Sequence, residues 1–123
     1  MIEGYISTTG TPVLEIKVEG KREDITAEGI LDTGFDGYLC LPISIAVSLG
    51  LELIKVVRTE LANGTILEDE LVFTGKVEWN GTLIEVDILL TKSEDILIGT
   101  SFLNGYSVNL DYQTKKVRIE KLA

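Results

Sequence analysis

The residues best suited to chemistry are the tripeptide Asp32-Thr33-Gly34, which directly follows the apolar segment Gly29-Ile30-Leu31. A carboxylate that emerges at the end of a buried strand can accept or donate a proton during hydrolysis. By itself the tripeptide is more typical of a turn after a strand, because Asp, Thr and Gly are all common there. The surrounding sequence therefore has to decide between these two interpretations.

The sequence contains no histidine, which excludes a Ser-His-Asp triad, a Cys-His pair and an imidazole metal site. Its single cysteine, Cys40, cannot form an internal disulfide. Cys40 lies in an apolar run and is predicted to be a small core residue rather than a nucleophile. No phosphate loop or dinucleotide fingerprint is present. Carboxylates are therefore the natural acid–base groups, and neither a metal nor another cofactor is predicted.

The 123 residues fit a single domain, residues 1–123. The formal net charge of −9 would repel a phosphate backbone, so a nucleic-acid partner is not expected. No apolar stretch has the length of a signal peptide or of a bilayer span. We therefore expect a soluble cytoplasmic protein that does not bind membranes.

The residue pattern predicts a mostly β fold with one or two short helices. Val, Ile and Thr are frequent, and apolar residues alternate over Val13–Val18, as in a half-buried strand. A helix is predicted over Ile43–Leu49, because Pro42 precedes it and Gly50 follows it. Further strands are expected over Gly4–Ser7, Ile25–Leu31, Leu53–Leu61, Thr65–Trp79 with a break, Leu83–Leu90, Ile96–Gly99, Tyr106–Leu110 and Lys116–Lys121, with a brief helix ending at Leu103. Asn63-Gly64 and Asn80-Gly81 each predict a hairpin turn.

The order of these parts resembles the retropepsin-like aspartic proteases, especially their small single-domain prokaryotic members. That family has a strand, Asp-Thr-Gly, a flap hairpin, an apolar-apolar-glycine strand, a short helix and a final strand. The corresponding parts, between about Leu14 and Ile119, are Ile30–Gly34, Ala62–Thr65, Ile96–Gly99, Thr100–Leu103 and Val117–Ile119. The resemblance implies an all-β, retropepsin-like acid protease β-barrel with one domain per subunit.

The resemblance also implies an aspartic endopeptidase that works as a homodimer on peptide or protein substrates. Each subunit would supply one Asp32, and two carboxylates a few ångströms apart share a proton because both cannot ionise easily. The ionised member would activate a water that attacks the peptide carbonyl, while the protonated member assists the carbonyl oxygen. Activity should then be favoured by acid, and no cofactor is needed.

Five further residues take roles from the resemblance. Thr33 would brace the two active-site loops across the dimer axis, and Gly34 would permit the tight loop. Asn63 and Gly64 would form the flap tip that closes over substrate; the alternative is an ordinary hairpin turn. Asp36 would bind the substrate backbone; the alternative is a solvated loop residue.

Two positions depart from the family pattern. Phe35 stands where the family has alanine or serine, and its ring would fill or reshape part of the substrate cleft. Thr100 stands where retroviral members carry an arginine that supports the dimer, so the dimer must be held differently.

Two other functions stay open. One is a non-catalytic dimeric module with the same fold that binds a peptide or protein, an extended peptide being added as a strand, while Phe35 or a shifted flap blocks chemistry. The other is a structural β domain that assembles with a partner protein. The substitution Asp32→Asn separates the first from a protease, which loses turnover, because a binding module keeps its affinity.

Overall fold

The computed structural model describes residues 1–60, 62–64 and 66–123. Within that range the chain forms ten strands, one α-helix and one 3-10 helix, which confirms the predicted all-β class. The strands are β1 (Ile2–Ile6), β2 (Pro12–Glu19), β3 (Asp24–Leu31), β4 (Leu39–Pro42), β5 (Glu52–Glu60), β6 (Ile66–Trp79), β7 (Thr82–Thr91), β8 (Leu97–Ile98), β9 (Tyr106–Asp111) and β10 (Lys116–Lys121). The helices are α1 (Ile43–Leu49) and η1 (Thr100–Leu103). No helix in the described part of the chain is long and apolar enough to cross a bilayer.

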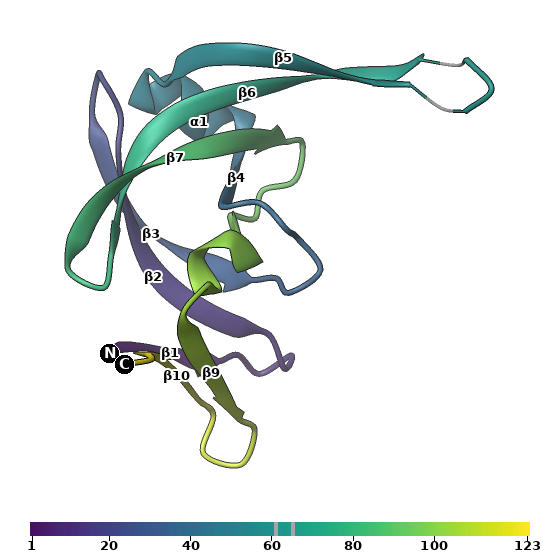
Figure 1. The fold of residues 1–123 in the computed structure, drawn as a ribbon. Coiled ribbons are helices and arrows are strands. Elements are labelled where there is room, and N and C mark those ends of the chain that lie inside the picture. Colours follow the sequence, from purple (N-terminus) through teal and green to yellow (C-terminus); the bar gives the residue numbers. More distant parts are fainter. Residues whose placement is uncertain (61, 65) are drawn as a thin grey trace.

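The strands form one sheet in the order β5-β6-β7-β4-β8-β3-β2-β1-β10-β9, and β6 also pairs with β2. This extra pairing joins β2, β3, β8, β4, β7 and β6 into a closed ring, which is the predicted barrel (Figure 1). The β5–β6 hairpin extends beyond the ring at one end of the sheet. At the other end, β1, β10 and β9 continue the sheet outward, and both chain termini lie beside them.

Local sequence signals explain several element boundaries. Helix α1 begins after Pro42 and ends at Gly50, whose φ of 67° is left-handed. Gly50 N–H donates to the Val47 carbonyl at 3.1 Å, and the next N–H, of Leu51, donates to the Ala46 carbonyl at 3.4 Å. Asn80 and Gly81 have φ values of 50° and 79° between the paired residues Trp79 and Thr82. Two successive positive φ values give the type I′ turn that the Asn-Gly pair predicts, because its twist matches that of the joined strands.

The sequence did not predict strand β4. All four residues of Leu39–Pro42 are buried, so the segment lacks the alternation of a half-buried strand and is hard to distinguish from a loop or helix start. Strand β6 is unbroken, whereas a break was predicted. Two predicted positions, Leu61 at a strand end and Thr65 in the hairpin turn, lie outside the described residues.

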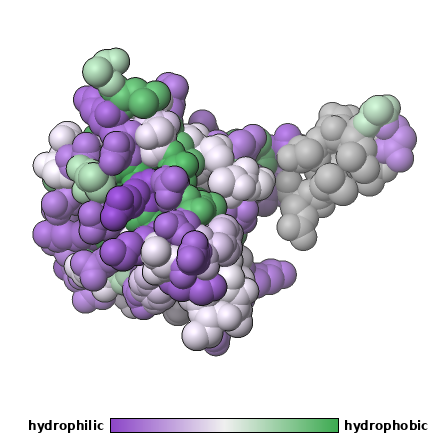
Figure 2. All heavy atoms as spheres, turned by 90° about the horizontal axis from the view of Figure 1, so that it is seen from below, coloured by the Kyte–Doolittle hydropathy of each residue, from purple (hydrophilic) through white to green (hydrophobic). Residues whose placement is uncertain are grey.

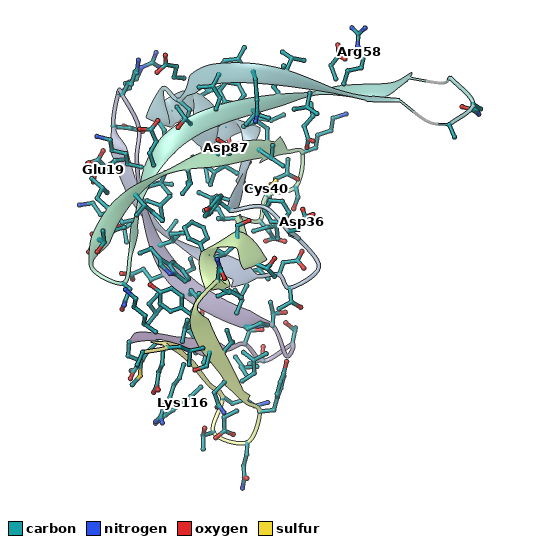
Figure 3. The ribbon with its side chains drawn as sticks, viewed as in Figure 1. Glu19, Asp36, Cys40, Arg58, Asp87 and Lys116 are labelled. Carbon is teal, nitrogen blue, oxygen red and sulfur yellow. The ribbon has the colours of Figure 1, made fainter. Side chains whose placement is uncertain are left out.

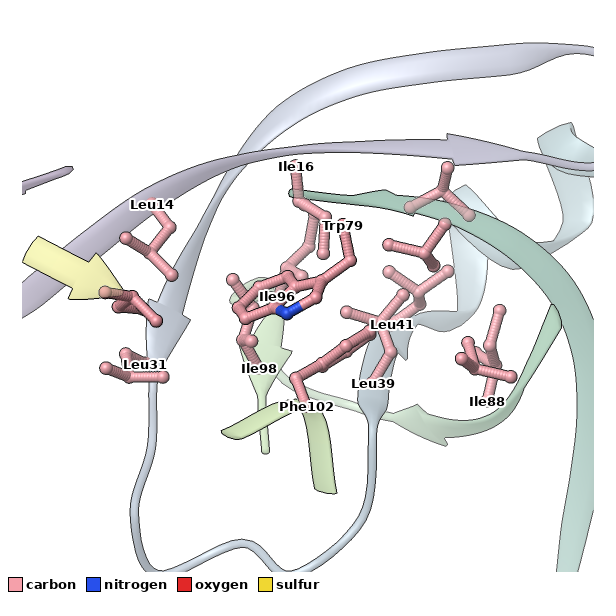
Figure 4. Close-up of a cluster of buried hydrophobic side chains, with 14 of the residues drawn as sticks. Leu14, Ile16, Leu31, Leu39, Leu41, Trp79, Ile88, Ile96, Ile98 and Phe102 are labelled. Carbon is pink, nitrogen blue, oxygen red and sulfur yellow. The ribbon is translucent and has the colours of Figure 1, made fainter. Parts of the chain in front are cut away.

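The core fills the inside of the ring (Figure 4). Trp79 stacks on Phe102 with ring centroids 4.6 Å apart, and Tyr106 meets the same indole edge-on. Branched aliphatic side chains from most strands surround this aromatic cluster, among them Leu14, Ile16, Leu39, Leu41, Ile88 and Ile98. Burial of this apolar surface holds β3 and β8 in place, and the candidate site begins where those two strands end.

Candidate functional site

Asp32 lies at the carboxyl end of β3, beside the short parallel strand β8. Its own N–H donates to the carbonyl oxygen of Ile98 at 2.9 Å, and two residues earlier Ile30 N–H donates to Ile96 at 2.8 Å. These bonds fix the backbone on which the carboxylate stands. The first sequence signature is therefore positioned by the second, with Leu31 and Ile98 paired in register between them.

The loop that follows turns tightly around the Asp32 side chain. Gly34 N–H donates to Asp32 Oδ1 at 2.9 Å, and Phe35 N–H donates to the Asp32 carbonyl at 3.1 Å. A backbone N–H aimed at a carboxylate oxygen is a charge-assisted bond that orients the acid group. Asp32 is half-buried, whereas Thr33 and Gly34 are exposed. The arrangement holds a carboxylate in one orientation at the rim of the barrel.

The rest of the loop is attached to the start of η1. Backbone N–H groups of three consecutive residues donate to loop carbonyls: Gly99 to Tyr38 at 2.8 Å, Thr100 to Phe35 at 2.9 Å, and Ser101 to Gly37 at 3.1 Å. The Ser101 hydroxyl adds a bond of 2.7 Å to the carbonyl of Asp36. Ser101 thus supports the site, a role that was not predicted from the sequence. Its polar type just after the second signature was the only available signal.

Thr100 occupies the position at which retroviral members carry arginine. In this chain both its N–H and its Oγ1 lie near the Phe35 carbonyl, at 2.9 and 3.4 Å. Thr100 therefore links the two signatures within one subunit.

Phe35 packs on two glycines. A Cβ placed on Gly37 would lie 2.6 Å from Phe35 Cζ, and one on Gly99 would lie 2.8 Å from Phe35 Cδ2. A Cβ on Gly99 would also collide with the Gly37 carbonyl oxygen. The half-buried Phe35 ring thus lies against the loop itself, in space that the two glycines leave open.

Residues 32–36 come together in this loop, and the other predicted site residues do not join them there. Asp36 is exposed (Figure 3). Asn63 and Gly64, with a Gly64 φ of 85°, lie in the turn between β5 and β6, at the far end of the projecting hairpin (Figure 1). The predicted flap residues are thus distant from Asp32 of the same subunit in this structure.

Cys40 is buried, as predicted, but it lies outside the main apolar cluster to which its neighbours Leu39 and Leu41 belong. Burial, with a smaller contribution from Glu70, raises the pKa of its thiol. A thiol with a raised pKa is a poor nucleophile at neutral pH, which agrees with the prediction that Cys40 has no catalytic role.

No protein-family model and no curated protein matches the sequence. Solved structures do match. A retropepsin-like aspartic protease from Rickettsia conorii superposes with a TM-score of 0.64 and 18% identity, covering 98% of this chain and 90% of that one. The chain has the retropepsin-like fold. A second match with this fold is EIAV protease in complex with the inhibitor HBY-793, with a TM-score of 0.55, 16% identity, and coverage of 80% of this chain and 89% of that one.

Proposed function

We propose that the chain belongs to the retropepsin-like aspartic protease family and acts as a homodimeric endopeptidase. The observation that carries this proposal is the position of Asp32. Its carboxylate accepts the Gly34 N–H at 2.9 Å, and its backbone is bonded to the second signature at Ile98. An ordinary turn aspartate requires no such partner strand, whereas an acid–base catalyst must be held in a fixed orientation.

The proposed reaction uses two Asp32 residues, one from each subunit. Close carboxylates share one proton, because two negative charges a few ångströms apart repel each other strongly. The ionised Asp32 takes a proton from a water molecule, and the water oxygen attacks the peptide carbonyl carbon. The protonated Asp32 donates to the carbonyl oxygen. The tetrahedral species then collapses as the peptide nitrogen gains a proton and the C–N bond breaks.

The homodimer follows from this chemistry, because the sequence of each subunit contains Asp-Thr-Gly once and one carboxylate cannot perform both proton transfers. Thr33 is exposed beside Asp32, where it is able to meet a second loop. Thr100 bonds within its own subunit, so we propose that the dimer is stabilised elsewhere than at this position.

The substrate is proposed to be a peptide or protein in extended form. Asp36 and the turn at Asn63-Gly64 are proposed to contact its backbone, the turn moving toward the loop as a flap. Phe35 is proposed to shape the cleft indirectly, because its ring fixes the loop by packing over Gly37 and Gly99.

Cleavage of casein over roughly pH 3 to 8, the range in which carboxylate pairs change protonation, tests the proposal. Wild-type protein should cleave best in acid, and Asp32→Asn should abolish cleavage. The control Asp36→Asn keeps the proton-transfer residue Asp32 and should not abolish cleavage. No cleavage by a folded, dimeric wild type would overturn the protease assignment. If both wild type and Asp32→Asn then bind an extended peptide equally, the function is peptide binding.

A further inference from the structure

A hollow of about 450 Å³ lies where strands β1 and β10 pair, on the face of the sheet that points away from the core. Gly4 and Val117 stand opposite each other at its floor. The Val117 side chain is fully buried in the core, so the residues on either side of it point into the hollow, because side chains alternate along a strand. The walls are Glu3, Tyr5, Lys116 and Arg118, and Thr114 and Lys115 close one end.

Positive charge gathers at this hollow. Of the 11 Lys and Arg residues in the chain, Lys115, Lys116 and Arg118 line it, against the single carboxylate of Glu3. The chain has 20 acidic residues, so a cation has many potential partners. Nevertheless, no ion pair between described residues involves any of the three cations of the hollow. Their charge is therefore available to a ligand.

Two acidic residues face these cations across the sheet without forming an ion pair with them. Glu3 stands opposite Arg118 on β1, and Asp111 stands opposite Lys116 on β9. The Asp111 carboxylate instead accepts two N–H groups of its own turn, at 2.9 and 3.0 Å. Attraction to Arg118 contributes least to the lowered pKa of Asp111. The nearest carboxylate is thus engaged with its own backbone, which leaves the ammonium group of Lys116 open.

The backbone of Lys115 gives an independent indication that its side chain has a role. Lys115 has a φ of 61°, in the left-handed region, which glycine and asparagine adopt much more readily than lysine. Every other described residue with a positive φ is a glycine or, at Asn80, an asparagine. A lysine at this position opposes local stability, and a ligand for its ammonium group explains why it is there.

We propose that this hollow binds a phosphate monoester, held by Lys115, Lys116 and Arg118. A guanidinium group binds phosphate oxygens in a bidentate manner, and ammonium groups add point charges beside it. A phosphate monoester carries close to two negative charges at neutral pH and three acceptor oxygens, so it suits three cations better than one carboxylate does. The volume of the hollow lies in the range of small-molecule sites and admits the group that carries the phosphate.

An extended polyanion is a poor match for the same hollow. Without its three cations the chain has a formal net charge of −12, compared with −9 for the whole chain. A nucleic acid or an anionic membrane would meet that negative surface beyond the hollow, whereas a compact dianion contacts the hollow alone.

The hollow lies apart from the Asp32 loop. Lys116 is at the end of the molecule where the two termini lie, away from Asp36 (Figure 3). Viewed from that end, hydrophilic side chains surround a smaller hydrophobic patch, as suits a site for a charged ligand (Figure 2). Phosphate binding therefore goes beyond the proposed peptide hydrolysis and does not depend on it.

Amide NMR of the full chain, titrated with inorganic phosphate at constant ionic strength, tests the site. We expect saturable shifts at residues 114–118. The double variant Lys116→Gln, Arg118→Gln should bind phosphate at least roughly tenfold more weakly, because two charge-assisted contacts are lost. The matched control, Lys76→Gln, removes a lysine that stands between two glutamates and should leave the affinity unchanged. A wild type without saturable shifts, or a double variant that binds phosphate like wild type, overturns the proposal.

Lys115→Asn gives a second result, in which stability and binding change in opposite directions. Asparagine suits the left-handed φ, so the urea midpoint should stay equal or rise. The phosphate affinity should fall several-fold, because one of the three cations is lost. A folded Lys115→Asn protein that binds phosphate as tightly as wild type overturns the assignment of Lys115 to the ligand.

A phosphorylated side chain of a protein and a small phosphorylated compound share this chemistry, and further titrations separate them. The probes are free phosphoserine, a phosphoserine peptide and the same peptide with serine. Tighter binding of the phosphopeptide than of phosphoserine supports the site and assigns it to a phosphorylated protein, whereas equal binding of the two supports it for a small compound. A serine peptide that binds as tightly as the phosphopeptide overturns the proposal. Asp32→Asn should bind phosphate like wild type, so failure of the protease assignment leaves this result unchanged.

Discussion

The attachment of the Asp32 loop to η1 depends on Gly99, and the substitution Gly99→Ala should break it. The added Cβ collides with the Gly37 carbonyl oxygen and comes within 2.8 Å of the Phe35 ring. Gly99 has φ −94° and ψ 173°, which alanine adopts without strain, so the collision is the only backbone-level penalty. Because the obstacle is a carbonyl within the loop, relief requires the loop to move away from residues 99–101.

The magnitude follows from three contributions. Overpacking costs about 1–3 kcal/mol. Weakening one or two of the loop hydrogen bonds adds about 0.5–1.5 kcal/mol each. Alanine also lowers the conformational entropy of the unfolded chain, which offsets about 0.4–1 kcal/mol of this loss. Taken at their central values, these contributions mean that Gly99→Ala should lower the free energy of unfolding by about 3 kcal/mol.

Gly29→Ala is the matched control, because a Cβ there meets only side-chain atoms of Ile96 and Ile98, at 3.0–3.1 Å. Those side-chain atoms can shift, so the loss of unfolding free energy should stay below about 1.5 kcal/mol once the unfolded-state gain is included. Urea unfolding, followed by the fluorescence of the single tryptophan Trp79, measures the free energy of unfolding of both variants. A Gly99→Ala protein that is as stable as Gly29→Ala would refute the account of the loop attachment.

Three further predictions concern single side chains. Ser101→Ala removes the 2.7 Å hydrogen bond to the Asp36 carbonyl and should lower the free energy of urea unfolding by up to about 1 kcal/mol. An unchanged urea midpoint would show that this bond contributes nothing to stability. Asp111 accepts N–H bonds from Thr114 and Gln113 at 3.0 and 2.9 Å, and these bonds lower its pKa. The resulting stabilisation is present above the pKa that Asp111 has in the unfolded chain, and it is lost as the pH falls through the lower pKa of the folded protein. Asp111→Asn should accordingly lower the melting temperature at pH 7 and have less effect in strong acid; an equal effect at both pH values would contradict the sign. Burial raises the pKa of the Cys40 thiol, so iodoacetamide should label native protein far more slowly than protein in urea, and equal rates would show that the thiol is accessible.

The sequence was sufficient where a local signal determines local geometry. Pro42 and Gly50 bound helix α1 at the predicted residues, and Asn80-Gly81 forms the predicted turn, because in each case the required φ values belong to the residues themselves. Asp32 was predicted to be the catalyst because Asp32-Thr33-Gly34 and the later segment Ile96–Gly99 together resemble the two signatures of the retropepsin-like proteases, and both segments are visible without any tertiary information.

Features that depend on long-range contacts could not be predicted in the same way. The pairing of β2 with β6 closes the ring between segments some sixty residues apart, with Val18 opposite Val77, and no local pattern encodes it. Strand β4 is buried on both faces and therefore shows no period. The roles of Ser101 and Thr100 arise only when residues 99–101 lie against the Asp32 loop, about sixty-five positions earlier in the chain.

The central proposal is that two Asp32 carboxylates from two subunits act together. Co-refolding wild-type protein with increasing fractions of Asp32→Asn, at constant total concentration, gives mixed dimers that contain one carboxylate. Casein cleavage should then fall as the square of the wild-type fraction, because only dimers with two Asp32 residues are active. A linear decrease would mean that each subunit works with its own Asp32, and cleavage unaffected by Asp32→Asn would mean that this residue has no catalytic role.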